Sequence, residues 1–202
     1  VLAQLQRKPA KMVLRAAYQG DRPSQWIAER ANLKPVVLPF TVGGDAEAAL
    51  TSLKRGALVK RVVGYSKSPT TTEKARLLGV IDIEAPSALM AVSGSDLVLI
   101  AVPVEATEAT LKTIKHMLTP NTLVMDVGST KRNVVDASRR VLKEHVGCFV
   151  AAHPIAGKEV SGIEYADPDL YQGRQVILTP IERTYTAHLQ KATDLWQALG
   201  CT

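Results

Sequence analysis

Residues 150–162, VAAHPIAGKEVSG, and residues 126–131, DVGSTK, each place polar side chains directly after a short apolar run. The apolar runs TLVMDV and CFVAA are typical of buried strands. Each motif therefore begins where a predicted strand ends. In an open parallel sheet, ligands bind at the carboxyl ends of the strands. We predict that both motifs line one binding site.

His153 is the candidate base of this site. An imidazole titrates near neutrality and can take a proton from a substrate hydroxyl. Ser129, in the other motif, could hydrogen-bond to the same hydroxyl. Each residue also has a purely structural interpretation, since a histidine at a strand end can cap the backbone and a serine can cap the helix that follows.

Composition places the chain among ordinary globular proteins. It has 202 residues, of which 46% are apolar and 22% are charged, with a formal net charge of +6. The basic residues are scattered and no aromatic-bearing motif accompanies them, which predicts attraction for anionic cofactors and substrates rather than nucleic acid. Neither a membrane span nor a secretory signal is visible, so we expect a cytoplasmic protein. Cys148 and Cys201 have no metal-like spacing and are expected to be reduced.

Strands and helices alternate through most of the chain. Strands are predicted at residues 59–65, 97–102, 122–126, 148–152 and 175–179, and helices at 71–79, 105–118, 131–145 and 186–200. This order indicates an α/β fold, doubly wound around a mostly parallel sheet. His116, His145 and His188 fall in helical patterns without partners, and we expect them to face solvent.

Five segments in this order, GYSKSP, DLVLIAVPV, DVGSTK, HPIAGKEVSG and DLYQGRQVILTP, resemble the nucleotide-binding domain of prephenate and arogenate dehydrogenases. The resemblance runs from about residue 48 to the end. It implies a Rossmann-like NAD(P)-binding domain and oxidative decarboxylation of a cyclohexadienyl substrate, prephenate or arogenate, in tyrosine biosynthesis. Members of the family are homodimers. Their C-terminal helical dimerisation domain is absent from this sequence, so we expect this chain alone to turn over poorly.

The resemblance also implies roles for individual residues. His153 is the base, Ser129 is its hydrogen-bonding neighbour, and Glu159 is the carboxylate at the substrate end of the pocket. Val102 and Pro103 are expected beside the nicotinamide ribose of the cofactor.

The glycine-rich turn that binds a dinucleotide pyrophosphate departs from the family pattern GxGLIGGS. Gly43 and Gly44 match its end, but Leu38 and Phe40 stand where the first two glycines belong, and Asp45 replaces the serine. These side chains obstruct a close backbone approach. The alternative interpretation is an ordinary strand-to-helix turn in a cofactor-silent Rossmann-like remnant or recombinant.

Five further residues belong to the predicted cofactor site. Ser66, Lys67 and Ser68 follow the second strand of the dinucleotide fold, where an acidic residue is typical of NAD users and a basic one accommodates the 2′-phosphate of NADP. With a lysine and no carboxylate there, the cofactor is predicted to be NADP or NAD. Asp126 and Gly128 are expected to face the cofactor from the next motif.

Residues 1–34 form a predicted strand-helix extension of foreign origin, followed by the NAD(P)-binding domain at 35–202. Strands are predicted at 11–18 and 35–40, with a helix between them. About 45 residues resemble the C-terminal part of periplasmic receptors of zinc and manganese importers, which leaves a metal-receptor-derived binding module as an alternative function. That segment has no histidine, so no metal site is predicted. A composite chain joined near Gly43 and Gly44 accounts for both resemblances.

Overall fold

A computed structural model describes residues 13–16, 35–38, 51, 58–156 and 167–202. The chain divides into two compact units, Val1–Thr41 with Gly157–Val160, and Val42–Ala156 with Ser161–Thr202. In the first unit, β1 (Val13–Ala16) pairs in parallel with β2 (Pro35–Leu38). Both strands were predicted at these positions. The helix predicted between them and the turn at Gly43 and Gly44 lie outside the described residues, and the domain boundary after residue 34 stays a prediction.

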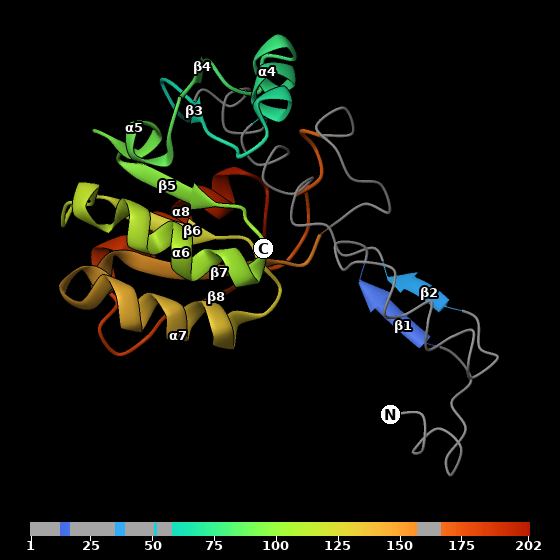
Figure 1. Ribbon diagram of the computed structural model, residues 1–202. Coiled ribbons are helices and arrows are strands. Elements are labelled where there is room, and N and C mark those ends of the chain that lie inside the picture. The colour runs from blue at the N-terminus through green and yellow to red at the C-terminus, as the bar shows by residue number, and fades with distance from the viewer. Residues whose placement is uncertain (1–12, 17–34, 39–50, 52–57, 157–166) are drawn as a thin grey trace, which may run out of the picture. The chain divides into compact units, whose positions relative to one another are not determined.

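The second unit alternates strands and helices along the chain (Figure 1). Its strands are β3 (Val63–Gly64), β4 (Ile83–Glu84), β5 (Leu97–Ile100), β6 (Leu123–Asp126), β7 (Phe149–Pro154) and β8 (Val176–Thr179). Its helices are α4 (Pro69–Leu77), α5 (Ala88–Val92), α6 (Val104–Ile114), α7 (Lys131–Leu142) and α8 (Thr186–Ala198), with short 3-10 helices η1 (Lys115–Met117) and η2 (Lys143–Cys148).

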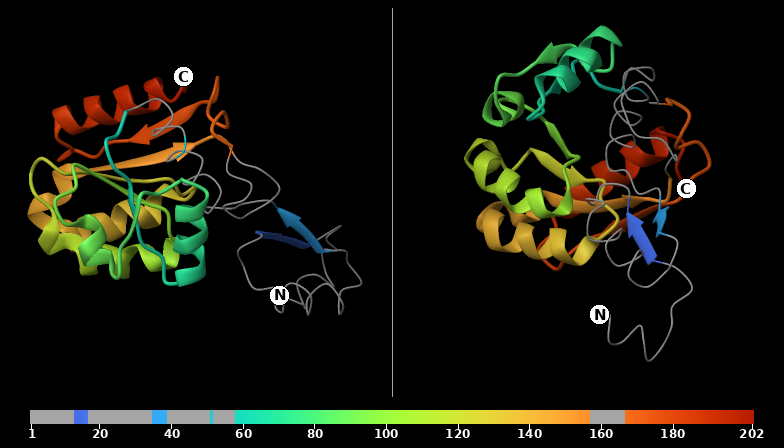
Figure 2. Two further views of the ribbon diagram at one scale, coloured as in Figure 1. Left: turned by 90° about the horizontal axis from the view of Figure 1, so that it is seen from above. Right: turned by 45° about the vertical axis from the view of Figure 1, so that its right-hand side comes forward.

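Sheet pairing confirms the predicted α/β, mostly parallel architecture. Strands β5, β6 and β7 are parallel neighbours, and β8 adds to β7 in the antiparallel sense. Strands β3 and β4 form a separate parallel pair. Figures 1 and 2 show α6 and α7 on one face of the four-stranded sheet and α8 on the other. The result is the helix-sheet-helix layering of a doubly wound, Rossmann-like fold.

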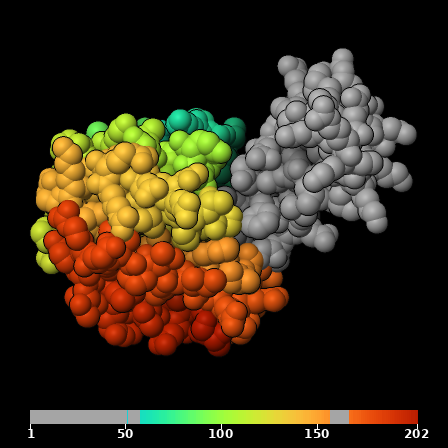
Figure 3. All heavy atoms as spheres, turned by 90° about the horizontal axis from the view of Figure 1, so that it is seen from below, coloured from blue at the N-terminus to red at the C-terminus, as the bar shows by residue number. Residues whose placement is uncertain are grey.

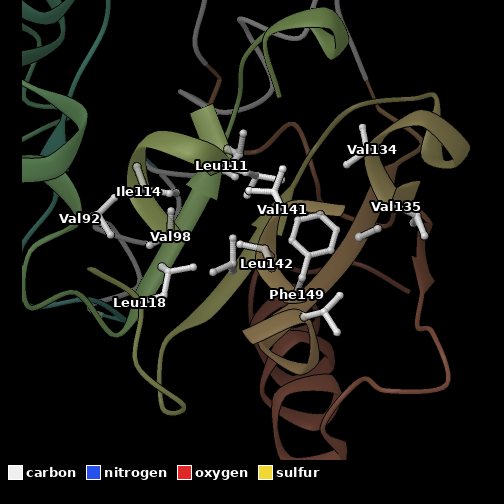
Figure 4. Close-up of a cluster of buried hydrophobic side chains, with 14 residues drawn as sticks. Val92, Val98, Leu111, Ile114, Leu118, Val134, Val135, Val141, Leu142 and Phe149 are labelled. Carbon is white, nitrogen blue, oxygen red and sulfur yellow. The ribbon is translucent and has the colours of Figure 1, made fainter. Parts of the chain in front are cut away.

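Two apolar clusters fill the spaces on either side of this sheet. The first packs α6 and α7 on the sheet and includes Leu111, Val134 and Phe149 (Figure 4). The second packs α8 on the opposite face, where Trp196 meets Tyr171 edge to face at a centroid distance of 5.3 Å. Residues of β5 contribute alternately to the two clusters, as predicted for a strand covered on both faces.

The C-terminal segment also packs beside α7. Figure 3 shows the region from β8 to α8 in red against α7 in yellow-orange. The Arg139 guanidinium donates to Glu182 Oε2 at 2.9 Å, and the amide of Tyr185 donates to the carbonyl of Gly147 at 2.9 Å. These contacts fix the connection that returns the chain from the sheet edge to α8.

The strand predicted at 59–65 is shorter in the structure. β3 contains only Val63 and Gly64, because the run is interrupted by exposed Lys60 and Arg61 and cannot be buried along its length. Gly64 approaches its neighbour closely, since a Cβ atom there would lie 2.7 Å from Ile81 Cδ1. The structure therefore has a closely packed two-residue strand where a longer buried strand was expected.

Of the three histidines expected to face solvent, His116 is exposed and His145 is partly buried. For His188 the prediction is wrong. Its side chain is only 5% exposed, Nε2 lies 2.8 Å from the carbonyl oxygen of Pro120, and the ring stacks on Tyr185 at 5.9 Å. The helical pattern around His188 gave no sign that the loop at Pro120 would cover it.

Both cysteines are buried free thiols. None of the helices in the described part of the chain combines the length and the apolar character needed to cross a bilayer.

A candidate active site at the carboxyl ends of β6 and β7

The register of the parallel strands brings the two motifs together. β6 and β7 pair Asp126 with Ala151, which is the last pair of their ladder. Gly128 and His153 each lie two residues beyond that pair. Because parallel strands end at the same edge of a sheet, the DVGSTK and HPIAGKEVSG motifs begin side by side, as predicted.

Asp126 is the buried anion of this edge. Only 2% of the residue is exposed. Its Oδ2 accepts a hydrogen bond from the Gly128 amide at 3.0 Å, and its Oδ1 accepts one from the Ala152 amide at 3.3 Å. Oδ2 also pairs with the ammonium of Lys131. The predicted role of Asp126 in cofactor binding stays a prediction, but its carboxylate is already used to join β6, α7 and β7.

Lys131 is the matching cation and is partly buried. It is the first residue of α7, and its side chain is 13% exposed. Besides pairing with Asp126, its Nζ donates to the carbonyl oxygen of Ala152 at 2.6 Å. A cation in the first turn is unfavourable to the helix dipole. The carboxylate and the carbonyl oxygen compensate for that arrangement, which explains how a lysine occupies this position.

Burial outweighs charge pairing in the titration of both groups. Burial raises the pKa of the Asp126 carboxyl, and Lys131 with the two amides opposes this only in part. Burial likewise lowers the pKa of the Lys131 ammonium against the opposing effect of Asp126. The removal of two charges from water is therefore costly here, as is general for buried ion pairs.

His153 lies on β7, partly exposed beside this pair. Its antiparallel partner on β8 is Ile177, which is 52% exposed. Burial is the largest cause that lowers the pKa of His153, the charge of Lys131 lowers it further, and Asp126 opposes both. The imidazole is consequently neutral at neutral pH, which is the form that can accept a proton.

Ser129 is partly buried in the turn between β6 and α7. The N-cap residue of α7 is Thr130, and no capping hydrogen bond comes from its side chain. Capping of α7 by Ser129, the structural alternative, is therefore not what the structure shows. Glu159, the third predicted catalytic residue, lies outside the described residues.

The remaining predicted cofactor residues occupy two turns. Val102 and Pro103 follow β5, where Pro103 is the N-cap of α6. Ser66, Lys67 and Ser68 lie between β3 and α4. Ser68 is the N-cap of α4 but its hydroxyl makes no capping bond, since it lies 2.9 Å from Thr70 Oγ1. Both turns follow strand ends, as a ligand-binding turn of this fold should.

Two features of the site were missed or incompletely predicted from the sequence. Lys131 stands in the first turn of the predicted helix, where a cation is unfavourable to the dipole. That position is compatible with an anion-facing or an exposed lysine, and it does not identify Asp126 as the partner. Nothing in the sequence indicated that Ile177 would lie opposite His153, because that position depends on the antiparallel register of β8. In the described part of the chain, no cluster of three or more metal-ligating side chains occurs.

The fold is Rossmann-like, and it places a histidine at the carboxyl end of β7. A family model described as "Prephenate dehydrogenase, nucleotide-binding domain" matches residues 49–202. The chain therefore belongs to the prephenate dehydrogenase family. The match begins after the first 45 residues, and nothing in these comparisons supports their predicted resemblance to metal receptors of importers.

Individual relatives agree with this assignment. Prephenate dehydrogenase of Bacillus subtilis is 35% identical over 164 residues, which cover 81% of this chain and 44% of that protein. Cyclohexadienyl dehydrogenase of Zymomonas mobilis is 32% identical over 136 residues, covering 67% of this chain and 46% of the relative. The crystal structure of prephenate dehydrogenase from Aquifex aeolicus superposes with a TM-score of 0.73 at 32% identity, covering 80% of this chain and 58% of that one. The chain thus spans about half the length of these relatives.

Proposed function

We propose that this chain is the nucleotide-binding part of an NAD(P)-dependent dehydrogenase that oxidatively decarboxylates prephenate or arogenate. The observation that carries the proposal is the position of His153, a neutral imidazole at the carboxyl end of β7. Relatives named as prephenate and cyclohexadienyl dehydrogenases support the substrate class. A structure of the Aquifex aeolicus enzyme in complex with hydroxyphenyl propionate and NAD+ supports the cofactor class.

The described residues fit a dinucleotide. The turn from Ser66 to Ser68 offers two hydroxyls and the ammonium of Lys67, and residues 65–68 contain no carboxylate. The hydroxyl of Ser68 makes no capping bond to α4, and the N-terminus of a helix attracts phosphate groups. We infer that Ser66, Lys67 and Ser68 hold the adenosine ribose and accept NADP as well as NAD. Val102, Pro103, Asp126 and Gly128 would border the nicotinamide half, with Gly43 and Gly44, outside the described residues, at the pyrophosphate.

A bound nicotinamide dinucleotide would supply the hydride acceptor. In the proposed reaction the substrate ring gives up a hydride, its carboxylate leaves as carbon dioxide, and its hydroxyl proton passes to the imidazole of His153. Ser129 would hydrogen-bond to that hydroxyl and orient it toward His153. Glu159 would face the substrate end of the pocket. The lowered pKa of His153 keeps the imidazole ready to accept the proton.

The first test is a calorimetric titration of the purified chain with NADP and with NAD. We expect saturable binding of at least one of them. His153→Gln should bind the dinucleotide as tightly as the parent chain, because the imidazole is assigned to proton transfer and not to the cofactor. Failure of both dinucleotides to bind would overturn the proposal and favour the cofactor-silent alternative, in which Leu38 and Phe40 exclude the pyrophosphate.

The second test is catalytic. Reduction of the dinucleotide is followed by its ultraviolet absorbance with prephenate and with arogenate. A preference for one substrate would distinguish a prephenate dehydrogenase from an arogenate dehydrogenase. His153→Gln should lower kcat by about a hundredfold or more, the usual contribution of a positioned base. Unchanged kcat in that variant would remove His153 from its assigned role. The homodimer, the cytoplasmic location and the lack of nucleic-acid, membrane and metal partners stay predictions.

A further inference from the structure

Two side chains bind the backbone of the residue directly before His153, Ala152. The ladder between β6 and β7 ends at the pair of Asp126 and Ala151. At the next residue, the amide of Ala152 donates to Asp126 Oδ1 at 3.3 Å, and its carbonyl oxygen accepts from Lys131 Nζ at 2.6 Å. One buried ion pair therefore binds both backbone groups of a single residue.

We propose that Asp126 and Lys131 are positioning residues that clamp Ala152 and thereby fix the presentation of the His153 imidazole to the substrate. The inference rests on the proposed function for the meaning of His153. It goes beyond that function because it assigns to Asp126 and Lys131 a joint task inside the protein. Lys131 binds the carbonyl oxygen of Ala152 just beyond the last pair of the ladder, where the chain of β6 turns toward α7.

Burial makes the clamp specific. The side chains of Lys131 and Asp126 are 13% and 3% exposed, so water cannot readily replace either partner. An unpaired backbone group at this depth is expensive, which holds Ala152 in one arrangement. On the opposite edge of β7, pairing continues with β8 through His153 and Ile177. The base is thus held between a strand on one side and an ion pair on the other.

The clamp also sets the charge around the imidazole. Among the described residues, the charged groups that act on His153 are Lys131 from α7 and Asp126 from β6, and β8 places the neutral side chain of Ile177 opposite it. The two charges act in opposite directions. Lys131 lowers the pKa of His153 and Asp126 raises it.

Because the two charges act in opposite directions, removing each of them should shift the pKa of His153 in an opposite direction. The titration of His153 is followed by NMR of the imidazole in the full chain, without cofactor or substrate, and the signal is assigned by its loss in His153→Gln. Lys131→Met should shift the pKa of His153 upward, because the ammonium is removed and the carboxylate remains. Asp126→Asn should shift it downward. The matched control is Arg132→Met, which removes the adjacent exposed cation of α7 and should leave the titration unchanged.

Two further variants separate positioning from simple stability. Lys131→Arg keeps a cation and should hold the pKa of His153 near its parent value. Asp126→Asn combined with Lys131→Met removes both charges without leaving one unpaired, which preserves folding if Lys131→Met alone does not fold. Its shift should be upward but smaller than that of Lys131→Met. Line widths of the His153 signals should increase in both variants that lack the ammonium, since the carbonyl oxygen of Ala152 then loses the donor that holds it.

The inference is overturned if Asp126→Asn and either variant lacking the ammonium shift the titration in the same direction, or if none of them shifts it. Loss of stability with an unmoved titration would mean that the pair only supports the fold. Neither result depends on dinucleotide binding. Failure of the proposed function would appear in the cofactor titration, whereas failure of the clamp would appear in the His153 titration.

Discussion

Helix α7 has ion pairs near both of its ends, and the pair at its first residue differs in burial from the Arg140–Glu108 pair in its last turn. At its first residue, Lys131 pairs with Asp126, and the side chains are 13% and 3% exposed. In its last turn, Arg140 Nη2 lies 2.7 Å from Glu108 Oε2, with side-chain exposures of 59% and 34%. Glu108 also pairs with Lys112 at 2.9 Å. Both pairs join a cation to a carboxylate. The Lys131–Asp126 pair is largely shielded from water, whereas the Arg140–Glu108 pair is exposed to it.

This difference shows that burial, and not the number of partners, determines how an ion pair affects the pKa of its carboxyl group and the stability of the fold. Burial raises the pKa of Asp126 in spite of Lys131. Hydrogen bonds from Lys112 and Arg140 lower the pKa of Glu108 to about 2, because little desolvation opposes them. A buried pair is costly to form and very costly to break, whereas an exposed pair contributes little either way. Only the buried pair is placed to organise a site.

The largest effect is expected from Lys131→Met. The substitution leaves the Asp126 carboxylate and the Ala152 carbonyl buried without their cation, which should lower the free energy of unfolding by about 3 kcal/mol. Urea denaturation followed by tryptophan fluorescence measures the loss, with Arg132→Met as the control. Adding Asp126→Asn should recover part of the stability. A loss no greater than that of the control would show that the pair is not effectively buried.

A smaller effect is expected for the pH dependence contributed by His153. Its pKa is lowered in the folded protein from 6.5. The unfolded chain therefore takes up this proton first as the pH falls, so the stability contributed above that value is lost on acidification. Urea midpoints at pH 7.5 and at about pH 5.5 should differ less in His153→Gln than in the parent chain. Equal differences in the two proteins would mean that His153 titrates as it does in the unfolded chain.

The smallest effect is expected from Glu108→Gln. At neutral pH and physiological salt, removal of this exposed carboxylate should leave the melting temperature nearly unchanged. Because its pKa is lowered from 4.5 to about 2, any contribution it makes is present above 4.5 and disappears as the carboxyl is protonated toward 2. Melting curves at low salt across that range would reveal it. A destabilisation at pH 7 comparable to that of Lys131→Met would contradict the comparison.

Long apolar runs made most of the second unit predictable. LVLI, LVMD and the run before His153 became β5, β6 and β7, since a short strand covered on both faces can bury so continuous a stretch. The strand predicted at 59–65 was too long for the converse reason. Charged residues interrupt this run, and only a two-residue strand forms. The solvent exposure predicted for His188 was wrong because the loop that buries it, at Pro120, is 68 residues away in sequence.

The sequence by itself determined the order of strands and helices, the family, and the two motifs that supply His153, Ser129 and Asp126. Those features are local, since each depends on residues adjacent in the chain. Tertiary structure decided that Lys131 would bind Asp126 and Ala152, and that Ile177 would lie opposite His153. Such contacts depend on strand register and helix placement. Distant residues become neighbours, and their charges matter, only after folding has removed the water between them.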